Sequence, residues 1–311
     1  MKPRSNERCT VPRPLAPPHP AQRLHERLGF SEAFHPPEAS RDRPLHEWRM
    51  EENDSPILRY LFRHARPRRH LEFGTWEGRG ALDCLEECDA TVWSINLREG
   101  ETDAQGRWAY DAWLDDFASP PSTGSAGEGR GGGDSPPSPA RAPLRKASAS
   151  RLTENASRLS TPLITRTARN GRTVVRTDAL GAIGRLVHEA GLGHRLCQVY
   201  CDSRAWDASN YPDGFFDTAL IDGGHAAEVV RSDTLNALRL VRPGGLIMWH
   251  DYCPDPMAQA TCSSVRGVVE AIGKLAPTIE RCCADWFWIE PSWLLLGVRN
   301  DRPFSLAEDA P

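Results

Sequence analysis

The segment from His70 to Gly80 constrains the fold of this chain more than any other. Its sequence, HLEFGTWEGRG, begins as a short apolar run and breaks into glycines before a segment that suits a helix. Glycines at such a junction let the backbone approach a ligand that Cβ atoms would block, and the amides of the following helix N-terminus favour negative charge. A strand that opens through glycines onto a helix indicates a parallel α/β sheet with a ligand at the turn.

The glycines of this turn stand at Gly74, Gly78 and Gly80, so the GxGxxG fingerprint of dinucleotide-binding folds is not present. The turn is looser, and it suits the methionine portion of a nucleoside cofactor better than a pyrophosphate. Glycines can also serve tight-turn geometry alone, so the functional interpretation depends on the rest of the chain.

Strand-like and helix-like segments alternate along the remaining sequence. Strands are predicted over residues 70–73, 91–97, 196–201, 215–221 and 246–249, and helices over residues 55–66, 78–88, 178–190, 226–240 and 265–275. Residues 287–289 and 294–298 are expected to form a closing antiparallel pair. This pattern predicts an α/β fold with a Rossmann-like, doubly wound, mostly parallel seven-stranded sheet, and such sheets bind ligands at the carboxyl ends of their strands.

Three tracts fall outside this alternation. Residues 1–45 are rich in Pro, Arg and His and are expected to form a disordered arm. Residues 118–150 consist almost entirely of Gly, Ser, Pro, Ala and charged residues, which predicts a disordered insertion. Residues 300–311 form a polar tail. One domain therefore spans residues 46–299.

Charge and composition narrow the range of partners. The net charge of -4 and the pI near 6.2 give no reason to expect nucleic acid or an anionic membrane as a partner. No apolar run approaches the ~20 residues of a membrane span, and the basic N-terminus is not followed by the apolar stretch of a secretory signal. The nine cysteines show no paired spacing, which is typical of reduced thiols. We therefore expect a soluble, cytoplasmic protein of undetermined oligomeric state.

Two further motifs lie near the predicted strand ends: FDTALIDGGH at residues 216–225 and LVRPGGLIMWHDY at residues 240–252. The first glycine segment resembles motif I of class I S-adenosylmethionine-dependent methyltransferases, E/DxGxxxG, at Glu72, Gly74 and Gly78. The two later motifs resemble the FDxxxIDGxH…LxPGGxxxxHDY signature of methyltransferase family 24. The resemblance covers about residues 56–299 without the insertion.

The resemblance implies a methyltransferase fold with S-adenosylmethionine at the first glycine turn. Cofactor contacts are then expected from the turn and from later strand ends, at Glu72, Gly74, Thr75, Trp76, Gly78, Asn96, Asp202, Ser203 and Asp222. Asn96 stands where the family usually carries an acid that binds the ribose hydroxyls, and Glu99 is a possible substitute. Asp202 stands where the family places an acceptor for the adenine amino group, although an Asx turn or a helix cap explains it nearly as well.

Asp222, His225, His250 and Asp251 are expected to converge, because they follow adjacent predicted strands. Carboxylates and imidazole suit Mg²⁺ or Mn²⁺, and similar metal-dependent sugar O-methyltransferases use aspartates at the positions of Asp222 and Asp251. Here His250 replaces one acid, and Gly224 stands where those relatives carry a carboxylate base. The alternative is a metal-free site in which His225, or else His250, is the catalytic base.

The function that follows is O-methylation of a hydroxyl on a small molecule, such as a sugar or a secondary metabolite. Two other functions remain open at this point. One is a non-catalytic cofactor-binding or interaction module that retains the fold, and the other is a nucleotide-dependent oxidoreductase, which would be expected to carry the GxGxxG turn that this chain lacks.

Overall fold

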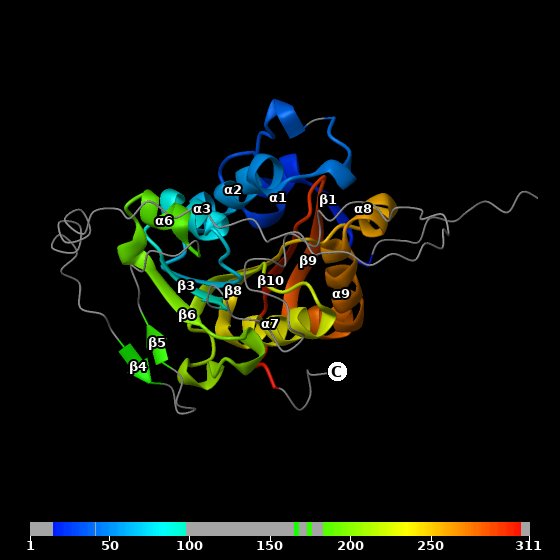
Figure 1. Ribbon diagram of the computed structural model, residues 1–311. Coiled ribbons are helices and arrows are strands. Elements are labelled where there is room, and N and C mark those ends of the chain that lie inside the picture. Colours follow the sequence, from blue (N-terminus) through cyan, green and yellow to red (C-terminus); the bar gives the residue numbers. More distant parts are fainter. Residues whose placement is uncertain (1–14, 41, 98–164, 168–172, 176–182, 306–311) are drawn as a thin grey trace, which may run out of the picture.

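An eight-stranded sheet runs through the part of the chain that the computed structural model describes, namely residues 15–40, 42–97, 165–167, 173–175 and 183–305 (Figure 1). The strand order is β1-β9-β10-β8-β7-β2-β3-β6. Within this sheet β10 is antiparallel to both neighbours, and every other neighbouring pair is parallel. The strands are β1 (Pro18–Pro20), β2 (Arg69–Phe73), β3 (Thr91–Asn96), β6 (Leu196–Tyr200), β7 (Phe216–Ile221), β8 (Val241–Trp249), β9 (Cys283–Glu290) and β10 (Leu295–Arg299).

Helices cover both faces of the sheet (Figure 1). One face carries α1 (Leu24–Leu28), α2 (Ser55–Ala65), α3 (Arg79–Glu87) and α6 (Arg185–Glu189), and the other carries α7 (Ala227–Leu240) and α9 (Ser263–Cys282). Successive side chains of a strand point to opposite faces of the sheet, so each strand contributes to both helix layers. In β7, Ala219 and Ile221 pack with α7 and α9, whereas Leu220 packs with α2 and α3. The described residues also form short elements: η1 (Ala21–Arg23), η2 (Glu38–Ser40), η3 (Leu45–Glu47), η4 (Met50–Asp54), η5 (Gly193–Arg195), η6 (Ser203–Ala205), η7 (Ala208–Asn210), α8 (Pro256–Thr261) and the separate hairpin β4 (Thr165–Thr167) with β5 (Thr173–Val175).

The predicted fold class is confirmed, with one strand more than the predicted seven. The predicted strands appear with shifts at their ends, the largest in β8, which begins at Val241 rather than at residue 246. Helix α9 continues to Cys282, beyond the predicted end at residue 275, although Pro277 lies inside it. A proline removes one backbone hydrogen bond, but Thr278, Ile279 and Cys282 are buried beyond it, and this packing holds the last turns in place.

The predicted disordered arm of residues 1–45 is wrong for its described part. Strand β1 pairs in parallel with β9 and extends the sheet by one strand, with Pro18 opposite Trp288. Ala16, Ala21 and Leu24 are each at most 1% exposed, so this segment is part of the core. Proline fits an edge strand, which needs few amide donors, and three residues are too short a run to show a strand in the sequence.

The other tracts lie largely outside the described residues. The predicted insertion at residues 118–150 is entirely outside them, as is Glu99, and only residues 300–305 of the predicted tail are described. Phe304 of that tail packs against the core cluster that contains α7 and α9. Among the described helices, none combines the length and the apolar character that crossing a membrane requires.

Candidate active site

The turn after β2 brings the backbone of Gly74 against the loop after β7. Gly74 has a φ of +88°, and a Cβ built on it would lie 2.1 Å from the carbonyl oxygen of Asp222. Gly78, with a φ of +92°, precedes α3, and a Cβ there would lie 3.1 Å from the Cα of Gly184. Both positions favour glycine, because other residues rarely adopt this φ, and at Gly74 the loop of Asp222 also leaves no room for a side chain.

Asn96, at the end of β3, hydrogen-bonds to the backbone of the glycine turn. Its Oδ1 accepts hydrogen bonds from the backbone N–H groups of Thr75 at 2.9 Å and of Trp76 at 3.5 Å. Its Nδ2 donates to the carbonyl oxygen of Leu97 at 2.7 Å. The amide that stands at the family's ribose-binding position thus holds the turn in shape, and its binding of a ribose stays a prediction.

Thr75 and Glu72 are buried beside the same turn. The hydroxyl of Thr75 hydrogen-bonds to the side chains of Ser94 on β3 and Gln198 on β6, so it ties the turn to the neighbouring strands. Glu72 is 1% exposed, and its Oε2 has no hydrogen-bond partner among the described residues. Burial, together with the charges of Asp222 and Asp83, raises the pKa of Glu72 well above its usual value. A cation that came within reach would therefore stabilise its carboxylate form.

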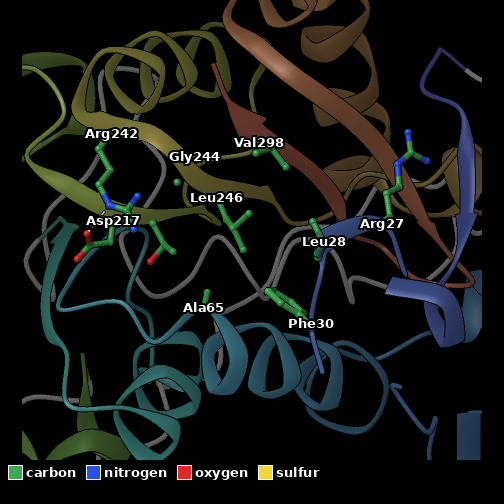
Figure 2. A pocket seen from close by; sticks show the side chains of 11 residues that line it. Arg27, Leu28, Phe30, Ala65, Asp217, Arg242, Gly244, Leu246 and Val298 are labelled. Atoms are coloured by element: carbon green, nitrogen blue, oxygen red, sulfur yellow. Dashed lines mark hydrogen bonds and ion pairs between the residues drawn. The ribbon is translucent and has the colours of Figure 1, made fainter. Parts of the chain in front are cut away.

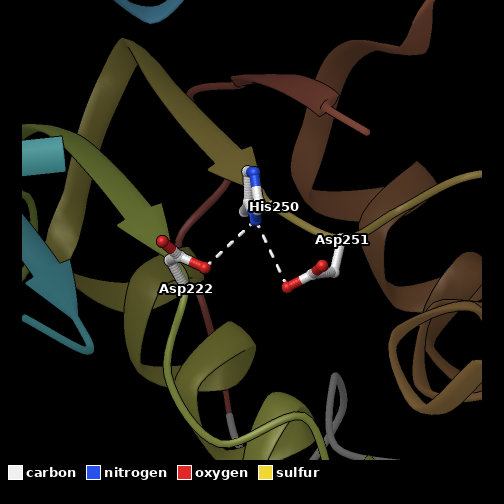
Figure 3. A group of neighbouring side chains, drawn as sticks. All are labelled: Asp222, His250 and Asp251. Carbon is white, nitrogen blue, oxygen red and sulfur yellow. Dashed lines mark ion pairs between the residues drawn. The ribbon is translucent and has the colours of Figure 1, made fainter. Parts of the chain in front are cut away.

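Asp222, His250 and Asp251 meet at the carboxyl ends of β7 and β8, as expected (Figure 3). Nδ1 of His250 lies 3.1 Å from Oδ1 of Asp222 and 3.2 Å from Oδ2 of Asp251. Despite these separations, the geometry gives Nδ1 no hydrogen bond among the described residues. One ligand atom from each of the three side chains lies within 4.8 Å of the others, which is a spacing that a metal ion could bridge.

His225 joins this group from the loop after β7. Its Nε2 lies 2.8 Å from Oδ2 of Asp251, and its side chain is 36% exposed, whereas that of Asp251 is 8% exposed. The hydroxyl of Ser264 on α9 donates to the other oxygen of Asp251 at 3.1 Å. Asp251 has a φ of 58°, which is uncommon for a residue with a Cβ and directs its carboxylate to both histidines. The two histidines and two aspartates predicted to converge therefore do so.

These groups carry opposite charges. Burial alone would lower the pKa of His250, but the carboxylates of Asp222 and Asp251 outweigh burial and raise this pKa well above its usual value. Burial would likewise raise the pKa of Asp251, but His225 and His250 hold it well below its usual range. The carboxylates thus favour proton binding by His250, and the histidines favour the ionised form of Asp251. His225 is the histidine of the pair with access to solvent.

Asp202 and Ser203 follow β6, at the same edge of the sheet. The carboxylate of Asp202 caps η6 by accepting from the backbone N–H of Arg204 at 3.0 Å, and it also accepts from the guanidinium of Arg204 at 2.6 Å. This arrangement matches the cap interpretation, and contact with adenine stays a prediction. Ser203 interacts with the buried Asp233 of α7, whose pKa is raised by burial to about 8.

Sequence reasoning missed Asp54, which contacts the other side of His250. It lies at the end of η4 in an acidic run, MEEND, where nothing distinguishes it from its neighbours. It is fully buried, and its Oδ2 lies 3.2 Å from Nε2 of His250. Burial raises the pKa of Asp54, and its hydrogen bonds to His250 and to Trp48 oppose that effect.

A separate cavity of about 200 Å³ opens at the amino ends of β7 and β8, at the opposite edge of the sheet (Figure 2). Its two arginines are already engaged, Arg27 with Asp285 and Arg242 with Asp217, each at 2.6 or 2.7 Å. Because no charge is left for a ligand there, the carboxyl edge is the candidate site.

A family model described as a methyltransferase domain matches residues 71–252, which is more than half of the chain. The matched range includes the glycine turn and all four predicted histidine and aspartate positions. The chain belongs to this family. The prediction of a class I S-adenosylmethionine-dependent methyltransferase is thus confirmed by the match and by the sheet, and the oxidoreductase alternative loses its support.

Comparison with solved structures gives weaker likenesses. An O-methyltransferase family protein from Burkholderia thailandensis is 15% identical with a TM-score of 0.43, over 80% of this chain and 55% of that chain. An O-methyltransferase from Bacillus cereus, solved in complex with SAH, is 14% identical with a TM-score of 0.42, over 82% of this chain and 84% of that chain. At these scores the likenesses carry no argument about the methyltransferase's chemistry. No protein of curated function matches its sequence.

Proposed function

We propose that this methyltransferase transfers the methyl group of S-adenosylmethionine to a hydroxyl oxygen of a small molecule, such as a sugar or a secondary metabolite. The observation that carries the proposal is the pair of His225 and Asp251, which joins a solvent-accessible imidazole to a buried carboxylate at 2.8 Å. This pair stands at the edge of the sheet that also carries the glycine turn, whose Gly74 packs against the backbone of Asp222.

The glycine turn supports the cofactor part of the proposal. Gly74 and Gly78 let the turn pack against the loops of Asp222 and Gly184, and this packing fixes the shape of the turn that would hold the methionine portion of the cofactor. Glu72 supplies a buried carboxyl group whose ionised form a cationic ligand would stabilise, and S-adenosylmethionine carries both an ammonium and a sulfonium group. The loop that holds Gly74 is in direct contact with Asp222, so that cofactor and acceptor would lie side by side.

The histidine pair supports the acceptor part. S-adenosylmethionine, when bound, would supply the methyl group to the acceptor hydroxyl oxygen, and its sulfur would keep the electron pair of the broken carbon–sulfur bond and leave as a neutral thioether. The hydroxyl proton would pass to the imidazole of His225, which Asp251 holds through Nε2. A carboxylate behind the imidazole fixes its tautomer and stabilises the imidazolium that forms.

A metal-assisted version of the same reaction is the second candidate. The specific observation is that Nδ1 of His250 and the carboxylates of Asp222 and Asp251 each offer a ligand atom, and these atoms all lie within 4.8 Å of one another. These three residues fit a divalent cation such as Mn²⁺ or Mg²⁺, which would bind the acceptor oxygen and lower the pKa of its hydroxyl. His225 would then remain beside Asp251 to receive the proton.

The test is methyl transfer from S-adenosylmethionine to a panel of catechols, sugars and phenols, followed as release of S-adenosylhomocysteine. For an accepted substrate, we expect His225→Gln to lower kcat by about 10²- to 10⁴-fold, because glutamine can bond Asp251 but cannot accept the proton. The control is His194→Gln, at an exposed histidine of η5. Equal kcat in His225→Gln and wild type would contradict the role of His225.

Two added measurements separate the remaining possibilities. Assays with EDTA and with added Mn²⁺ or Mg²⁺ distinguish the metal-free from the metal-assisted version. Calorimetric titration with S-adenosylhomocysteine distinguishes an enzyme with an untested acceptor from a folded module. Tight binding without transfer to any acceptor would favour the module, and failure to bind at millimolar concentrations would overturn the proposal.

A further inference from the structure

Asp54 is a buried carboxylate whose two oxygens contact different partners. Oδ1 accepts from the indole Nε1 of Trp48 at 2.7 Å and from the backbone N–H of Trp293 at 3.1 Å. Oδ2 lies 3.2 Å from Nε2 of His250. The two donors to Oδ1 come from segments far apart in the chain, so the orientation of the carboxylate is fixed from two sides. Oδ2 is thereby directed at His250.

The ring of His250 is held between Asp54 on one side and the site carboxylates on the other. Its side chain is 6% exposed and that of Asp54 is fully buried, so water cannot replace this contact. If Asp54 is ionised, its carboxylate can only accept hydrogen bonds, and Nε2 then carries the proton that it shares with Asp54. Nδ1 is then the nitrogen that faces Asp222 and Asp251.

We propose that Asp54 is a positioning residue of this active site, which acts through His250 and does not itself touch the acceptor. It keeps the proton on Nε2 of His250 and turns Nδ1 toward Asp222 and Asp251. This inference rests on the proposed function for the identity of the site. In the metal-free version, Asp54 holds the ring of His250 between the carboxylates. In the metal-assisted version, the same contact leaves Nδ1 as the ligand atom, because an outer carboxylate sets the tautomer of a metal-binding histidine.

The structure predicts what Asp54→Asn does to the ring. Two N–H donors, from Trp48 and Trp293, point at the place of Oδ1, so the new amide must put its oxygen there. Its NH₂ group then points at Nε2 of His250 and requires that nitrogen to accept. The proton of the ring moves to Nδ1, as happens when asparagine replaces an orienting aspartate. The substitution thus reverses the tautomer with almost no change in volume.

The experiment is NMR of the full chain labelled with ¹⁵N-histidine, with the His250 signals assigned by their loss in His250→Gln. We expect Nε2 of His250 to be protonated in the wild type and unprotonated in Asp54→Asn. Binding of S-adenosylhomocysteine should stay within about twofold, whereas methyl transfer to the best acceptor of the panel should fall by about 10- to 100-fold. The control is Asp217→Asn, at a half-buried carboxylate on the opposite edge of the sheet that accepts a hydrogen bond from Arg242. It should leave both the protonation of Nε2 of His250 and the rate of methyl transfer unchanged.

Each outcome decides the inference. A protonated Nε2 in Asp54→Asn together with an unchanged rate overturns it while the proposed function stands. If the wild type methylates no acceptor, the proposed function fails, and the nitrogen signals alone still show whether Asp54 sets the tautomer. If Asp54→Asn does not fold, the wild-type spectrum decides, since an unprotonated Nε2 there is incompatible with the inference.

Discussion

Gly74 faces the carbonyl oxygen of Asp222 so closely that a Cβ on Gly74 would lie 2.1 Å from it. The turn that is proposed to hold the cofactor and the loop that carries the first acid of the site are therefore packed backbone to backbone. The position of one sets the position of the other.

This contact gives the first prediction. Gly74→Ala should weaken S-adenosylhomocysteine binding by more than tenfold, because the new methyl group must push the loop of Asp222 away. Gly191→Ala is the matched control, since Gly191 also has a positive φ, of 74°, but nothing lies within 4 Å of its Cβ position. Both variants lose about 1–2 kcal/mol to backbone strain. Calorimetric titration measures the affinity for S-adenosylhomocysteine, and thermal unfolding measures the loss of stability. Equal cofactor affinities in the two variants would contradict the prediction.

Asn96 gives a prediction about the shape of the turn. Asn96→Ala removes the acceptor for the N–H groups of Thr75 and Trp76, so we expect S-adenosylhomocysteine to bind about tenfold more weakly, corresponding to ~1.4 kcal/mol. Asn96→Asp keeps the acceptor and should bind at least as well as Asn96→Ala. Calorimetric titration of the wild type, Asn96→Ala and Asn96→Asp with S-adenosylhomocysteine measures the three affinities. The prediction fails if Asn96→Ala binds as tightly as the wild type.

The N-terminal segment gives a prediction about stability. Leu24 is fully buried, whereas Leu15, nine positions earlier, is 48% exposed. Leu24→Ala should lower the free energy of unfolding by about 2–5 kcal/mol, because it opens a cavity in the core. Leu15→Ala should change it by less than about 0.5 kcal/mol. Urea unfolding measures both, and a small effect of Leu24→Ala would show that this segment is not part of the cooperative core.

His70 gives a prediction about pH. Burial lowers the pKa of His70 to about 3, whereas an unfolded histidine titrates near ~6.5. Between these values the unfolded chain binds a proton that the folded chain does not, so the stability from this residue is present above about pH 6.5 and is lost as the pH falls.

The expected size is about 1.4 kcal/mol per pH unit. His70→Phe should therefore show a shallower dependence of unfolding free energy on pH between pH 4.5 and 5.5 than the wild type. Urea unfolding at several pH values provides the comparison. Parallel lines for the two proteins would mean that His70 titrates in the folded state as it does in the unfolded one.

Local patterns were sufficient to predict most of the sheet and the convergence at its edge. The alternating apolar segments located β2, β3, β6 and β7, and parallel topology then brought Asp222 and Asp251 to one edge. Asp54 could not be found this way, because its burial depends on Trp48 and Trp293, which reach it only in the folded chain. Strand β1 was missed because its three residues gain their strand character from β9 alone.

The contact between Asp54 and His250 joins positions 196 residues apart in the sequence. Closing so long a loop has an entropic cost that local contacts do not offset, so we expect this contact to form late in folding. Methyl transfer should consequently become possible only at the end of folding, and incompletely folded chains should show no activity toward the substrates.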